Sequence, residues 1–90
     1  MLNELEVMVL NNLIDRYLLV REEWLKAKES GNTEYYAMHC HARGEAMGRI
    51  DGVLKMIEMR LGTTVELNWD MAVDDNIRKI VIAGYDEQFI

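Results

Sequence analysis

Residues 35–61 read YYAMHCHARGEAMGRIDGVLKMIEMRL, and we expect them to form one long helix. The unusual feature of this segment is a row of glycines, Gly44, Gly48 and Gly52, which continues the four-residue spacing that begins at Cys40. Each glycine inside a helix costs roughly 0.8–1 kcal/mol relative to alanine. Residues four apart lie on one side of a helix, so this row would let another backbone or a ligand come close. Close packing of two helices is the favoured interpretation, and contact of a ligand with the bare backbone is the alternative.

The preceding segment, residues 3–30, also has the apolar periodicity of a helix. Its apolar positions cover more than half of the helix circumference, whereas a surface helix needs a stripe of only about 100°. These positions are Leu2, Leu5, Val7, Val9, Leu10, Leu13, Ile14, Tyr17, Leu18, Val20, Trp24 and Leu25. Such a wide arc implies two surfaces to cover, one against the second helix and one against a second subunit. We therefore expect a homo-oligomer, either a dimer or a larger assembly.

The connection between the two predicted helices is very short. Gly31 can take the left-handed conformation that ends a helix, and Asn32 or Thr33 can cap the next one. Long helices joined by so short a turn lie antiparallel. We expect a helical hairpin with helices at residues 3–30 and 33–61, each roughly 40 Å long at about 1.5 Å per residue.

The period changes after residue 62. Residues 64–70 alternate between apolar and polar side chains, and residues 77–83, which read IRKIVIA, are rich in β-branched side chains. A β-hairpin over residues 64–83 is therefore predicted, with helix as the competing interpretation for residues 74–83, followed by a tail at residues 84–90. The predicted fold class is α+β, in one domain of residues 1–90: a long antiparallel two-helix hairpin followed by a small C-terminal β-hairpin.

The composition limits the range of functions. The chain has 90 residues and a net charge of −6, which disfavours direct binding to nucleic acid or to an anionic membrane surface. The longest uncharged run, residues 7–14, is too short to cross a bilayer. A single cysteine, Cys40, excludes an internal disulfide and fits a reducing compartment. We expect a cytoplasmic protein.

Arg43 is the most informative charged residue, because it falls within the apolar arc of the second helix. An antiparallel hairpin would gather Arg21, Arg43 and His39 among the three aromatic rings of Tyr17, Trp24 and Tyr36. Arginine forks match phosphate or carboxylate oxygens, and aromatic faces stack on a base. The candidates for binding an anionic, nucleotide-like ligand are therefore Arg21, Trp24, Tyr36, His39 and Arg43. The structural alternative, which we favour, is that the arginines pair with nearby acids while their stems cover apolar surface.

The tripeptide His39-Cys40-His41 does not predict a metal site. Adjacent helical residues point about 100° apart, so His39 and His41 diverge and cannot share one ion. His41 and Glu45 are four apart, but two ligands are too few for zinc without help from another chain. Cys40 is expected to be a small buried residue rather than a nucleophile. No metal and no cofactor are predicted.

No catalytic signature remains after these exclusions, since the glycines lie inside a helix and not in a phosphate-binding loop. The chain is therefore expected not to be an enzyme. The favoured function is that of a small acidic regulator or inhibitor that docks to another protein; in size and character the chain resembles accessory proteins of phages and mobile elements. The alternative function is the binding or sequestration of a nucleotide-like small molecule between helices or subunits.

Overall fold

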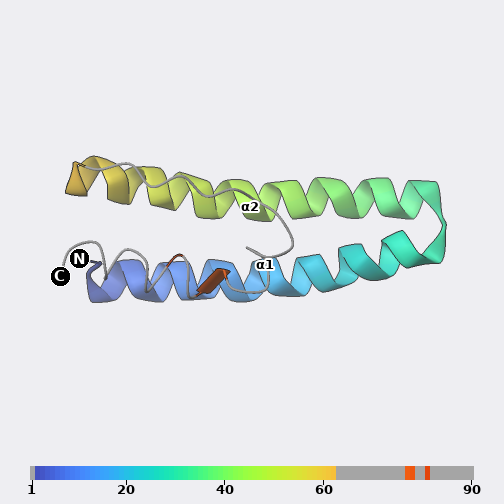
Figure 1. Ribbon diagram of the computed structural model, residues 1–90, viewed down its shortest axis with the longest axis horizontal. Coiled ribbons are helices and arrows are strands. Elements are labelled where there is room, and N and C mark those ends of the chain that lie inside the picture. The colour runs from blue at the N-terminus through green and yellow to red at the C-terminus, as the bar shows by residue number, and fades with distance from the viewer. Residues whose placement is uncertain (1, 63–76, 79–80, 82–90) are drawn as a thin grey trace.

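The computed structural model describes residues 2–62, 77–78 and 81 of the chain. Helix α1 (Glu4–Ser30) and helix α2 (Thr33–Leu61) run antiparallel and lie side by side along their length (Figure 1). The longest dimension of the molecule is 46 Å, close to the roughly 40 Å rise of a helix of this length. The two predicted helices and their hairpin arrangement are confirmed.

The ends of both helices are defined by local backbone chemistry. Gly31 and Gly62 follow α1 and α2 with φ values of 74° and 70°, the left-handed conformation in which glycine is least strained. At the start of α1, the Glu6 amide donates to Asn3 Oδ1 and the Asn3 amide donates to Glu6 Oε1, both at 2.8 Å. At the start of α2, the Tyr35 amide donates to Asn32 Oδ1 at 3.0 Å. These side chains accept from amides that the first turn of a helix leaves without partners. Asn3 and Asn32 therefore define where the two helices begin.

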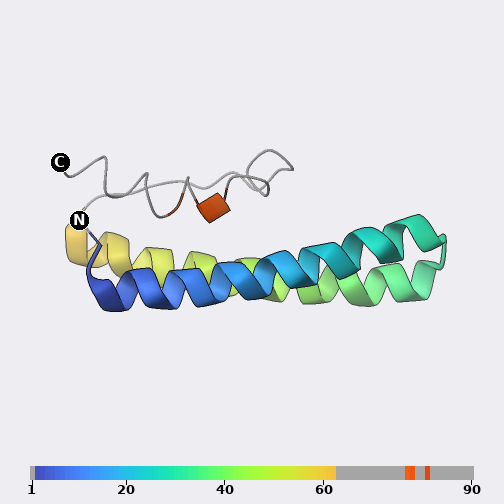
Figure 2. The same cartoon turned by 90° about the horizontal axis from the view of Figure 1, so that it is seen from below.

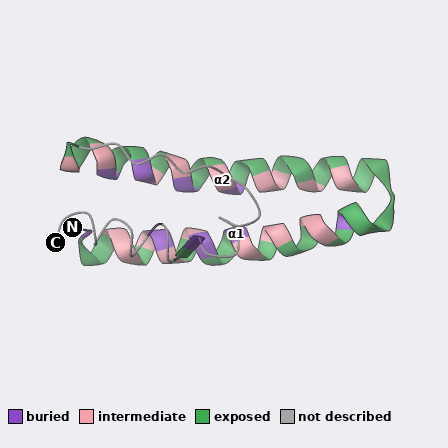
Figure 3. Cartoon of the chain, viewed as in Figure 1, coloured by how far each residue is buried: buried purple, intermediate pink, exposed green. Residues whose placement is uncertain are grey.

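The core lies along the line where the two helices face each other (Figure 3). Its helical members are apolar side chains spaced by three or four residues on each helix, so each helix contributes one continuous apolar stripe. The buried residues are Leu10, Ile14 and Tyr17 of α1, Ala46, Ile50, Leu54 and Ile57 of α2, and Leu2, Ile77 and Val81.

The predicted C-terminal β-hairpin is wrong for the part of it that the structure describes. Residues 77, 78 and 81, which fall in the predicted second strand, are helical, and no strand occurs among residues 2–62, 77–78 and 81. Ile77 and Val81 are each 1% exposed and belong to the core. At both positions the backbone is helical and the side chain reaches the core, so burial overrides the strand preference of β-branched residues. The α+β class is therefore replaced by a helical one, while the predicted first strand (64–70) and the tail (84–90) lie outside the described residues.

Charged contacts join the helix ends and attach the C-terminal residues. Arg60, near the end of α2, donates through Nε to Glu6 Oε2 at 2.9 Å, and its Nη2 binds the other oxygen of the same carboxylate. This hydrogen bond from Arg60 is the largest cause that lowers the pKa of Glu6 below its ordinary value. Arg78 binds both Asn11 and Asp15 of α1. Figure 2 shows residues 77–78 on one side of the hairpin.

Candidate functional site

Three of the predicted ligand-binding residues meet in one cluster between the helices. The Arg43 guanidinium carbon lies 4.6 Å from the centroid of the Trp24 ring and 6.0 Å from that of the buried Tyr17 ring. The Tyr36 ring lies 6.0 Å from Trp24, and Lys28 Nζ lies 5.5 Å from the same indole. Two cations and one aromatic ring thus surround Trp24, and each cation is stabilised by the ring quadrupole.

Cys40 completes this cluster from α2. The indole Nε1 of Trp24 donates to Cys40 Sγ at 3.2 Å. The hydrogen bond between Tyr36 and Cys40 is the largest cause that raises the pKa of Tyr36 above its ordinary value. The cysteine is exposed, contrary to the expectation that it would be a buried residue.

The remaining two candidates are Arg21 of α1 and His39 of α2. His39 packs edge-on against Tyr35, with ring centroids 4.5 Å apart. Its Nε2 is buried and has no hydrogen-bond partner in the described part of the chain. Arg21 is half-buried on α1, one turn before Trp24. The side chain of α1 that donates a hydrogen bond to Cys40 is that of Trp24. The structure therefore brings Trp24, Tyr36, Arg43 and Cys40 together, whereas a ligand site that includes Arg21 and His39 stays a prediction.

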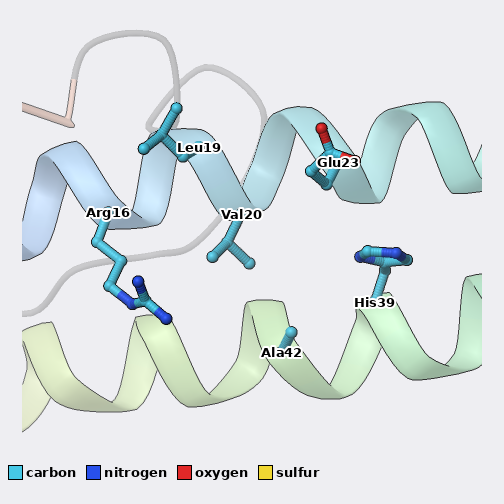
Figure 4. A pocket seen from close by; sticks show the side chains of 6 residues that line it. All are labelled: Arg16, Leu19, Val20, Glu23, His39 and Ala42. Atoms are coloured by element: carbon cyan, nitrogen blue, oxygen red, sulfur yellow. The ribbon is translucent and has the colours of Figure 1, made fainter.

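His39 instead contributes to a shallow groove between the helices. The groove has a volume of about 220 Å³. Its lining residues are Arg16, Leu19, Val20 and Glu23 of α1 with His39 and Ala42 of α2 (Figure 4). In Figure 4, Val20 and Arg16 point towards α2, and His39 points towards α1.

The glycine row lies on the exposed outer side of α2. A Cβ atom added at Gly44, Gly48 or Gly52 would meet nothing within 4 Å. The described residues therefore do not make the close approach that the spacing predicts, and close packing against another molecule stays a prediction. The row continues at the same spacing into Met56, which is 71% exposed, and Met59 beside it is 85% exposed. We call Gly48, Gly52, Met56 and Met59 the outer face of α2.

No group of three or more His, Cys, Asp or Glu side chains among the described residues is placed to hold a metal ion. His41 Nε2 lies 3.3 Å from Glu45 Oε1, and both side chains are largely exposed. In residues 2–62, 77–78 and 81, no helix has the length and apolar content needed to span a membrane.

Sequence reasoning placed Tyr17 among the aromatic rings near Arg43, but it missed Lys28, which the spacing could have revealed. Lys28 lies four residues after Trp24, and Tyr17 lies seven residues before it, so all three fall on neighbouring positions of one side of α1. The groove could not have been found in this way, because it depends on how the two helices are set against each other.

Comparisons with protein-family models, with curated proteins and with solved structures gave no match for this chain.

Proposed function

We propose that this chain is a small, acidic, non-catalytic interaction protein that acts as a homo-oligomer and docks to another protein as a regulator or inhibitor. The observation that supports this role is the outer face of α2, where Met56 and Met59 are 71% and 85% exposed. Exposed apolar side chains that adjoin one another are typical of surfaces that bind a partner.

The chemistry of this face suits a helix or a flat apolar surface on the partner. Methionine is flexible and polarizable, so it adapts to partners of different shape. Gly48 and Gly52 have open space where a side chain would stand, so a partner backbone can approach α2 there. Lys55 is exposed between these residues and can bind an acidic group at the rim of the contact.

The alternative role as a nucleotide-like ligand binder is less favoured, because Arg43, Lys28 and Tyr36 already surround the Trp24 ring on which a base would stack. A cytoplasmic location is proposed because the chain carries a single cysteine and a net charge of −6.

The test is quantitative capture of partners by the immobilised full chain. Met59→Glu places a charge on the outer face of α2, and Met38→Glu is the matched control, since it adds the same charge at another exposed methionine of the same helix. Proteins that the wild type and Met38→Glu retain, and that Met59→Glu loses, would support the proposal. If folded Met59→Glu, as judged by circular dichroism, retains the same proteins as the wild type, the outer face of α2 is not the docking surface.

A further inference from the structure

A second surface, on α1, has the spacing of a helix-pairing seam. The residues are spaced alternately by four and three positions, the repeat with which one helix packs along another. They are Leu5, Val9, Asn12, Arg16, Leu19 and Glu23, which we call the α1 seam. Leu5 and Leu19 are 63% and 66% exposed, and Val9 is half-buried. The α1 seam therefore lies along a helix that still presents apolar surface after it has packed against α2.

The shape beside the α1 seam is complementary to the seam itself. Leu19 stands at the rim of the groove, and Val20 and Ala42 line the space below it (Figure 4). The groove, with a volume of about 220 Å³, has room for an aliphatic side chain. A projecting residue next to a hollow is the arrangement that a two-fold interface requires, because each copy then fills the hollow of the other.

The charges on the α1 seam select one register for such a pairing. Two copies of α1 that pack antiparallel about a two-fold axis between Leu19 and Val20 place Arg16 of each copy opposite Glu23 of the other. The pairing forms twice, because the symmetry is reciprocal. Arg16 makes no ion pair with the described residues, and Glu23 pairs only with the exposed Lys26, at 3.4 Å, so both side chains can turn towards a partner.

We infer that two copies of this chain associate through the α1 seam, with Leu19 of each copy entering the groove of the other and with reciprocal Arg16–Glu23 pairs. The inference rests on the homo-oligomer of the proposed function. It assigns the contact between copies to the α1 seam, which is distinct from the outer face of α2. The molecule measures 46 Å by 20 Å, so a dimer that stacks along its length can bury on the order of 800 Å² per copy, the area typical of a stable complex.

The test is a charge exchange in the full chain, measured by sedimentation equilibrium against the monomer mass of 10.5 kDa. Arg16→Glu and Glu23→Arg each turn two attractive pairs into repulsive ones, so each single variant should weaken dimerisation by about tenfold or more. The double variant Arg16→Glu/Glu23→Arg restores opposite charges in the same register and should dimerise with nearly the affinity of the wild type. Both positions are exposed on α1, so each variant should fold, and circular dichroism is the check that it does.

Three outcomes would overturn the inference: a monomeric wild type, a dimer whose affinity the single variants leave unchanged, or a loss of affinity that the double variant does not restore. A monomeric wild type would also remove the homo-oligomer from the proposed function. The second and third outcomes would refute only the α1 seam. Partner capture that depends on Met59 tests the outer face of α2 separately, so the two failures are distinguishable.

Discussion

Replacing Gly48 with alanine should stabilise the isolated chain. Gly48 lies inside α2, and an added Cβ atom would meet nothing within 4 Å. The substitution therefore changes only the helix propensity, which favours alanine over glycine by roughly 0.8–1 kcal/mol. In a domain of this size, a change of about 1 kcal/mol shifts the Tm by about 4–8 °C. Gly44→Ala and Gly52→Ala should act in the same direction, and their effects should add approximately.

The assay is thermal unfolding followed by circular dichroism at several protein concentrations. Gly62→Ala is the control, because Gly62 has a φ of 70° and a side chain in that conformation costs roughly 1–2 kcal/mol. We expect Gly48→Ala to raise the Tm and Gly62→Ala to lower it. A lower Tm for Gly48→Ala would mean that another part of the molecule packs against the glycine row, and the reasoning about an open outer face would be refuted. A partner that uses the row should bind Gly48→Ala less tightly, although the chain itself is more stable.

Three further substitutions test the core, the ion pair and the aromatic cluster. Glu6→Gln should lower the Tm at neutral pH, because it removes the charged bond between the Glu6 carboxylate and Arg60. The Tm difference from wild type should shrink as the pH falls through the lowered pKa of Glu6, since protonation of the native carboxylate removes the same charged bond. An equal Tm difference at pH 7 and pH 3 would contradict this linkage. Ile77→Ala should cost about 2–5 kcal/mol in urea unfolding, since Ile77 is 1% exposed, whereas the control Met59→Ala should stay within about 0.5 kcal/mol. Arg43→Ala should lower the Tm, because it removes the cation from the face of the Trp24 indole. Nucleotides should leave the Tm of the wild type unchanged. A nucleotide-induced rise in Tm that Arg43→Ala abolishes would instead favour the ligand-binding role.

The helical hairpin could be predicted from the sequence because its determinants are local. Gly31 and Gly62 end the two helices, and Asn32 caps the second. Apolar residues three and four positions apart mark the buried stripes. Such signals depend on a few neighbouring residues and do not require knowledge of the rest of the fold.

The C-terminal residues and the site were harder to predict because they depend on long-range packing. Ile77 and Val81 fit a strand by composition and a helix by their four-residue spacing, and only the presence of the core decides between the two. The sequence placed Arg43 near aromatic residues, but it could not show that the guanidinium lies 4.6 Å from the Trp24 ring centroid. The position of His39 beside the groove depends likewise on how the helices are set against each other.

The carboxylate of Glu6 couples the fraying of the two helices at the end of the hairpin opposite the turn at Gly31. It accepts the Asn3 amide at the start of α1 and also binds Arg60 near the end of α2. One protonation event therefore loosens the first turn of one helix and the last turn of the other. Fraying of the two termini should be concerted, and amide hydrogen exchange at both ends should accelerate together in acid while the turn at Gly31 remains protected.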